Sequence, residues 1–162
     1  MYMDSVCLVG HTEIAGKREI IKKKLLTVLN FLIDNGFTEF YLGGANDWET
    51  ICAITILGLK ETNQNIHLNY VLPYKNEIYT CKWSQSKRRM LLEFIGKADS
   101  VEYVSERRGG HCLMRRDARL VELGDVCVCY YDERRRIRPT ERIMKMVMEK
   151  GIYIFNVFEK DI

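Results

Sequence analysis

The chain has 162 residues, of which 47% are hydrophobic and 29% are charged, with two prolines and eleven glycines. This length and composition predict one compact domain over residues 1–162 with its own apolar core, and they exclude a disordered or low-complexity chain. No apolar run approaches the roughly 20 residues of a membrane-spanning helix, and the first residues lack the basic and apolar regions of a signal peptide. We therefore expect a cytoplasmic protein without membrane contact.

Strand-like and helix-like patterns alternate along the whole chain. In chain order they are a strand over 5–9, a helix over 15–35, a strand over 38–42, a helix over 47–62, a strand over 66–72, a helix over 83–97, a strand over 100–104, a helix over 114–123, a strand over 126–131, a helix over 139–150 and a strand over 152–157. This alternation predicts an α/β fold, a doubly wound, mostly parallel sheet of five to six strands with helices on both faces.

The longer connections all follow the carboxyl ends of strands. They cover 74–82, 105–113 and 132–138, and the short turns at Gly10 and Gly43 follow the first two strands. In an open α/β sheet, ligands bind at this edge, where the strand order reverses. The functional residues are therefore expected there.

A glycine turn between the second strand and its helix is the most informative local feature. In Gly43-Gly44-Ala45, the backbone can approach an anion closely, and the helix that follows offers unpaired N–H groups. Gly10-His11 forms a second turn of this kind on the same edge. The pattern resembles a phosphate cradle, although a plain tight turn remains an alternative.

Several short motifs in a fixed order resemble one known family. They are Val6-Cys7-Leu8-Val9-Gly10-His11, Phe40-Tyr41-Leu42-Gly43-Gly44-Ala45 with Trp48-Glu49, Leu72-Pro73-Tyr74, Trp83, Ala98-Asp99, Tyr103-Val104-Ser105, and Arg116-Asp117 with Leu120-Val121-Glu122 and Gly124-Asp125. In this order they resemble the SLOG superfamily and, within it, the YpsA-like branch, domain of unknown function 1273. The resemblance covers nearly the whole chain, from about residue 6 to residue 157.

The resemblance implies a Rossmann-like domain related to the LOG phosphoribohydrolases and to DNA-processing protein A. Members bind nucleotides or nucleotide-derived ligands at the sheet edge described above. By position, the turn over 43–45 matches the family's Gly-Gly-Ala, and Glu49 stands where an Asp is usual. Arg116 matches the Arg of an Arg-Asn pair, which implies a guanidinium that faces the ligand. The alternative is that Arg116 pairs with Glu122 or Asp125 and has only a structural role.

Two positions depart from the family pattern. Arg138-Pro139-Thr140 replaces a Gly-Gly-Thr turn, so only Thr140 remains of a second phosphate cradle. Proline has no N–H to donate, and an anion bound here would be met by guanidinium groups instead. Asp47 stands where a glycine is common, and its carboxylate would repel a phosphate or act as an N-cap.

Three functions are compatible with these residues. The leading one is the binding of a nucleotide-derived small molecule, as a sensor or a sequestering module, by Gly10, His11, Gly43, Gly44, Ala45, Glu49, Arg116 and Thr140. The first rival is N-glycosidic hydrolysis of the LOG type, with Glu49 or Glu122 as the carboxylate. It is disfavoured because Ile143 stands where the family's Glu would fall.

The second rival is nucleic-acid binding, suggested by the arginine-rich second half. Residues 107–142 hold ten arginines against six acids, a balance of +4. This excess is modest for non-specific DNA binding, which depends on many phosphate contacts.

Neither a metal nor a cofactor is expected. Cys127 and Cys129 lie one residue apart in an apolar strand, and the chain has no Cys-x-x-Cys, so a zinc site is disfavoured. We also expect a homo-oligomer, because the very apolar helix over 48–59 exceeds what one sheet can cover and because relatives in the superfamily self-associate.

Overall fold

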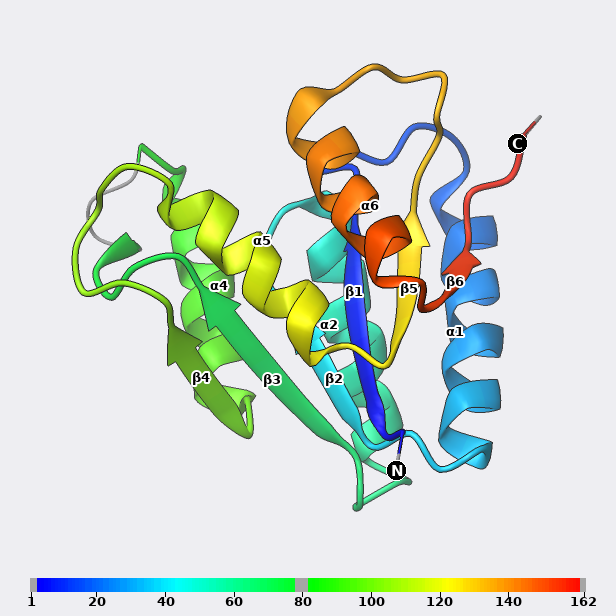
Figure 1. Ribbon diagram of the computed structural model, residues 1–162. Helices are drawn as coiled ribbons and strands as arrows, with labels where there is room; N and C mark the ends of the chain where they lie inside the picture. The colour runs from blue at the N-terminus through cyan, green and yellow to red at the C-terminus, as the bar shows by residue number, and fades with distance from the viewer. Residues whose placement is uncertain (1–2, 78–81, 161–162) are drawn as a thin grey trace.

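The computed structural model describes residues 3–77 and 82–160 and shows a sheet with helices packed on it (Figure 1). Within these residues the strands are all parallel and pair in the order β4-β3-β2-β1-β5-β6. Their bounds are β1 Ser5–Gly10, β2 Glu39–Leu42, β3 His67–Leu72, β4 Ser100–Tyr103, β5 Val126–Tyr130 and β6 Tyr153–Asn156. The expectation of a doubly wound parallel sheet is confirmed.

Helices cover both faces of the sheet. Their bounds are α1 Arg18–Asp34, α2 Asp47–Lys60, α4 Gln85–Lys97, α5 Cys112–Leu123 and α6 Arg138–Lys150. Leu25, Trp48 and Leu91 bring α1, α2 and α4 into one buried cluster, whereas Leu120 and Val147 bring α5 and α6 into another. Figure 1 shows α5 and α6 in front of the sheet and the other three helices behind it.

The sequences of the central strands are continuous apolar runs because the sheet is buried on both faces. Along β1, Leu8 packs into the cluster under α1, α2 and α4, while Cys7 and Val9 pack into the cluster under α5 and α6. On the neighbouring strand, Cys127 and Cys129 join the second cluster as small buried residues. The cysteines that the structure describes carry free thiols.

The strand order places a switch point between β1 and β5. From β1 the chain steps outward through β2, β3 and β4, and it then returns to the other side of β1 for β5 and β6. The carboxyl ends of β1, β2 and β5 therefore lie next to one another, at the top of Figure 1. A crevice between diverging loops is expected at such a point.

The observed helix ends differ from the expected ones by a few residues. The first helix begins at Arg18 rather than at 15, because the Tyr130 hydroxyl donates to the Ala15 carbonyl at 2.6 Å and accepts its N–H at 3.1 Å. This contact holds the preceding residues as a loop. α5 begins at Cys112, two residues earlier than expected. Of the connection over 74–82, residues 78–81 lie outside the described residues.

No helix in the described part of the chain has both the length and the apolar character needed to cross a bilayer.

Candidate ligand-binding site

A small cavity of about 80 Å³, called here the switch-point cavity, lies between the end of β1, the start of α2 and the amino-terminal halves of α5 and α6. Its polar lining comes from Gly10, Thr12, Asn46, Glu49, Arg116, Asp117 and Thr140. Four residues that the sequence predicts for the site, Gly10, Glu49, Arg116 and Thr140, thus share one cavity although they come from four segments of the chain. Its volume matches one small polar group rather than a whole nucleotide.

Arg116 is the fifth residue of α5, and its side chain reaches across to the turn after β2. Its Nη1 donates to the Gly43 carbonyl at 2.8 Å, and its Nε donates to Oδ1 of Asp117 at 2.9 Å. Gly43 permits this approach, because a Cβ there would lie 2.9 Å from Cδ of Arg116 and 3.0 Å from Cδ1 of Leu120. The first glycine of the turn therefore has a packing role beside Arg116.

The alternative pairing of Arg116 with Glu122 or Asp125 is not what the structure has. Glu122 pairs with Arg119 at 3.3 Å, and the Asp125 carboxylate accepts the backbone N–H groups of Asp4 and Ser5. Arg116 pairs with its neighbour Asp117, whose other carboxylate oxygen lies 3.6 Å from Nη2 of Arg142. This Arg-Asp-Arg arrangement connects the starts of α5 and α6.

Glu49 and Asn46 cap the amino end of α2 reciprocally. Oδ1 of Asn46 accepts the Glu49 N–H at 2.9 Å, and Oε1 of Glu49 accepts the Asn46 N–H at 3.1 Å, which is a capping box. The N-cap is therefore Asn46 and not Asp47. The Asp47 carboxylate instead pairs with Arg18 and accepts the Ile14 N–H, so it holds the loop after β1 against α2.

Glu77 is a buried carboxyl that sequence reasoning missed. It follows β3 and is only 4% exposed, and it faces Arg116, Glu49 and Lys87. Burial raises its pKa to about 7, against the opposing attraction of Arg116. Burial also raises the pKa of Glu49, although Arg116 partly offsets the effect. Two carboxyls with weakened acidity therefore flank one guanidinium, a pattern that is enriched at functional sites.

Two wider hollows lie at the same edge of the sheet. One, of about 390 Å³, is lined by Tyr74, Glu77, His111 and Arg142 among others. The other, of about 480 Å³, shares Thr12 and Asn46 with the switch-point cavity and extends toward Lys87 on α4. Together these hollows give the edge enough room for a ligand much larger than a single phosphate group.

The turn after β1 has a structural explanation of its own. Gly10 has φ +144°, and a Cβ there would collide with the Tyr130 carbonyl of β5. His11 is fully buried, and its Nε2 accepts the Asp132 N–H at 3.0 Å. Burial lowers the pKa of this imidazole, so it is neutral at physiological pH. In this structure the His11 side chain offers no surface to a ligand.

The other expected residues divide between the site and the far end of the sheet. Thr140, 3% exposed, lies in the first turn of α6 and lines the switch-point cavity, and Ala45 is buried within its turn. Glu122 lies near the end of α5, six residues beyond Arg116, and its side chain is 70% exposed. Six helical residues span about 9 Å, so Glu122 lies away from the edge that holds Arg116.

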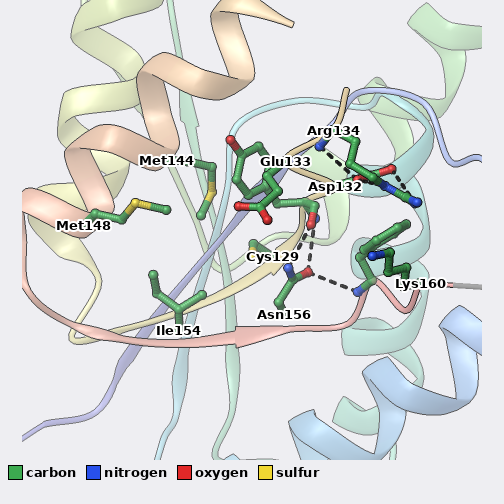
Figure 2. A pocket seen from close by; sticks show the side chains of 11 residues that line it. Cys129, Asp132, Glu133, Arg134, Met144, Met148, Ile154, Asn156 and Lys160 are labelled. Atoms are coloured by element: carbon green, nitrogen blue, oxygen red, sulfur yellow. Dashed lines mark hydrogen bonds and ion pairs between the residues drawn. The ribbon is translucent and has the colours of Figure 1, made fainter. Parts of the chain in front are cut away.

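A separate hollow of about 400 Å³ lies between β5, β6 and α6 (Figure 2). Met144 and Met148 project into it from α6 and Ile154 from β6, while Arg134 is paired with Asp132 at the rim. Asn156 bonds the backbone N–H and carbonyl of Tyr131 and so holds the loop after β5. None of the residues predicted for the site lines this hollow.

Among the described residues, no group of three or more His, Cys, Asp or Glu side chains is arranged to hold a metal ion. The chemistry available at the switch point is instead that of one guanidinium, two carboxyls of raised pKa and the amide and hydroxyl groups of Asn46 and Thr140. Such a set can hold an acceptor group through Arg116 and exchange a proton through Glu49 or Glu77.

Comparisons with known proteins agree with this architecture. A UPF0398 protein of Halalkalibacterium halodurans is 26% identical over 115 residues, which cover 70% of this chain and 60% of that protein, so the chain spans about 60% of the relative's length. The X-ray structure of TM1055, a Northeast Structural Genomics Consortium target, has a TM-score of 0.55 at 15% identity, covering 94% of this chain and 72% of that one. A model of the YspA SLOG family matches residues 9–157, and the chain therefore belongs to that family.

Proposed function

We propose that the carboxyl edge of the sheet binds a nucleotide or nucleotide-derived small molecule, as a sensor or sequestering module. The observation that carries this proposal is the position of Arg116, a partly buried guanidinium fixed beside the glycine turn at the switch point. A charged donor held in place by backbone and carboxylate loses little side-chain freedom on binding a ligand. Family membership and the Rossmann-like fold support the same class of ligand.

The sizes of the three hollows support a ligand in several parts. One anionic or carbonyl group would contact Arg116 in the cavity of about 80 Å³, and the rest would lie in a hollow of about 390 or 480 Å³. Typical sites for small molecules measure about 300 to 1,000 Å³. A nucleoside monophosphate fits this division, with its phosphate near Arg116.

Calorimetric titration with a panel of nucleoside mono- and diphosphates tests the proposal. Arg116→Lys keeps the positive charge and loses the fork geometry, so we expect its affinity for the best ligand to fall roughly tenfold, about 1.4 kcal/mol. Arg119→Lys is the matched control, because Arg119 lies on the same helix but pairs with Glu102 outside the cavity. Equal losses in both variants would contradict a ligand role for Arg116, and the absence of binding by the wild-type protein across the panel would contradict the function itself.

A second candidate function is N-glycosidic hydrolysis, which the two carboxyls beside Arg116 favour. Glycoside cleavage uses a pair of carboxyl groups, one of them with a raised pKa that lets it act as an acid. Here Glu77 has that property, and Glu49 lies on the same edge, whereas Glu122 does not. Chromatography of nucleoside monophosphates incubated with the protein would detect free base. No release by the wild-type protein, or equal release by Glu77→Gln, would contradict this candidate.

Nucleic-acid binding receives less support from the arrangement of the arginines. Arg119, Arg134 and Arg136 pair with Glu102, Asp132 and Glu141, so their charges are partly neutralised within the protein. Binding that depends on phosphate contacts weakens steeply with salt. Affinity for single- or double-stranded DNA that falls by orders of magnitude between low and high salt would favour this alternative over a small ligand.

We also propose that the protein self-associates through α1 and α2. A mainly apolar groove of about 600 Å³ runs between these helices, and Ile54 and Leu26 are 58% and 43% exposed in it. Exposed apolar surface of this kind is common where two copies of a chain meet. A cytoplasmic location remains part of the proposal, because the described cysteines are free thiols, as is usual in reducing compartments.

A further inference from the structure

A carboxylate of the protein lies against the glycine turn of the candidate site. Oε1 of Glu49 accepts the Asn46 N–H at 3.1 Å, and a Cβ at Gly44 would lie only 3.0 Å from the same oxygen. This oxygen therefore lies against the bare backbone of the turn. Missing side chains and available N–H groups are the features that let a turn before a helix bind an anion. In this structure the anionic group beside the turn is the side chain of Glu49.

The groups around Glu49 come from every element packed against it. Arg116 on α5 and Lys87 on α4 attract its carboxylate, whereas Asp117 on α5 repels it. Glu77 and Tyr70, from the β3 side, and Cys52 on its own helix also feel its charge. The two cations do not fully offset the cost of burial, because the pKa of Glu49 remains raised. Ionisation of Glu49 is therefore less favourable in the folded protein than in water.

We propose that the Glu49 carboxylate is a built-in competitor for anionic ligands: it occupies the anion position of the 43–45 turn, and an anionic group binds there only when Glu49 has lost its charge or moved away. This inference rests on the proposed function and describes how the same site is regulated. It makes Glu49 a determinant of selectivity. Ligands with strongly charged phosphoryl groups bind weakly while Glu49 is ionised, and they bind with uptake of a proton.

A substitution that separates charge from structure is available. Glutamine at the third helical position can serve in a capping box as glutamate does. Glu49→Gln therefore keeps the bond to the Asn46 N–H and the volume of the side chain, and it removes only the charge. Glu49→Ala removes the competing group altogether and serves as a second variant. Glu122→Gln is the matched control, because it removes an exposed acid at the far end of α5.

Sulfate is a suitable probe, because it stays doubly charged throughout the pH range in which the carboxyls titrate. We expect Glu49→Gln and Glu49→Ala to bind sulfate at least tenfold more tightly than the wild-type protein at pH 8, and Glu122→Gln to bind like wild type. The difference between wild type and Glu49→Gln should shrink as the pH is lowered toward 5, since a protonated Glu49 is also uncharged. Because the charge of Glu49 helps to raise the pKa of Glu77, the same comparison is repeated in the Glu77→Gln background, where Glu49 is the remaining carboxyl of this pair.

Sulfate binding that is equal or weaker in Glu49→Gln and Glu49→Ala, with both variants folded by thermal unfolding, would overturn the inference. So would a wild-type affinity for sulfate that rises with pH. Nucleoside monophosphates, titrated in parallel, keep the two proposals distinguishable. If the variants gain sulfate affinity but no protein binds a nucleotide, the competitor role stands and the proposed function fails. If wild type binds nucleotides and the variants gain nothing, the reverse holds.

Discussion

Nη1 of Arg116 lies 2.8 Å from the carbonyl oxygen of Gly43, so a side chain of α5 is tied to the turn between β2 and α2. Gly43 is separated from Arg116 by 73 residues in the sequence. The contact bridges two helices that lie on opposite faces of the sheet, at the edge where the strand order reverses. Arg116 therefore contributes to the shape of the site as well as to its charge.

Removal of Arg116 should cost stability. In Arg116→Ala, the Gly43 carbonyl loses its donor, and the nearly buried Asp117 loses the closer of its two ion pairs within the described part of the chain and keeps the one with Arg142 at 3.6 Å. An unsatisfied buried polar group typically costs about 1 to 3 kcal/mol, and we expect a loss of that size in the free energy of unfolding. Urea denaturation of wild type and Arg116→Ala measures it. A variant as stable as wild type would mean that the two contacts contribute nothing to the fold.

Gly43 lies against neighbouring side chains, whereas Gly58 has open space beside its Cα, so alanine should have opposite effects at the two positions. Gly43→Ala places a Cβ against Arg116 and Leu120, so we expect it to shift the guanidinium and lower stability by roughly 1 to 3 kcal/mol. Gly58→Ala in α2 meets nothing within 4 Å and should stabilise the helix by about 0.5 to 1 kcal/mol. Thermal unfolding of both variants tests the contrast, which would be refuted if they shifted the melting temperature in the same direction.

Gly44→Val tests the anion position from the other side. A Cβ at this residue would lie 3.0 Å from Oε1 of Glu49, so valine should displace that carboxylate and disturb its bond to Asn46. The branched valine side chain would itself fill the space against the turn, and an anion could no longer approach the backbone there. We expect loss of ligand binding together with about 1 kcal/mol of stability, the usual worth of a helix cap. Calorimetry and denaturation on the same preparation separate the two effects. Ligand affinity equal to that of wild type would show that the turn has only a structural role.

Glu77 should make stability depend on pH. Its pKa is raised to about 7 in the folded protein, so the folded state binds the proton more tightly than the unfolded chain. Stability should therefore be greatest below the unfolded pKa, fall as the pH rises from about 4.5 to 7, and level off above that. Glu77→Gln removes this dependence, and we expect it to be more stable than wild type by roughly 1 to 3 kcal/mol at pH 8 and similar to it at pH 4. Denaturation series at the two pH values would refute this if the variant were the less stable protein at pH 8.

The proposed self-association has a direct test. Ile54→Asp introduces a charge on the exposed face of α2, in the groove beside α1. We expect light scattering to show an oligomer for wild type and a monomer for the variant, with unchanged circular dichroism, since Ile54 is not part of the core. Wild-type protein that is monomeric at micromolar concentration would refute the proposal.

The fold follows closely from local patterns, whereas the site follows from them only in part. Apolar runs, helical spacing and the glycine turns are local signals, and they predict the strands and the carboxyl edge because both faces of the sheet are buried. Arg116 could be predicted as a site residue because it follows a long loop at that edge. Glu77 could not be predicted, since an isolated acid in a polar connection belongs to no sequence pattern, and only the fold brings it toward Arg116.

For two further residues, position along the chain is a poor guide to whether the side chain reaches the candidate site. Glu122 shares a motif with Arg116, but the helix between them carries it away from the edge and leaves it exposed beside Arg119. His11 directly follows a strand on the correct edge, but the loop after β5 folds over it and Asp132 bonds its ring. In both cases the decisive factor is a contact between distant segments, which periodicity does not encode.

Amide chemical shifts of ¹⁵N-labelled protein, recorded during titration with nucleoside mono- and diphosphates, test the central claim most directly, because they report both weak binding and its location. We expect at least one of these molecules to shift the amides of Gly43, Gly44, Ala45 and Thr140, and these shifts to be lost in Arg116→Ala. Shifts confined to the hollow around Asn156 and Met148, or no shifts with any member of the panel at millimolar concentration, would contradict it.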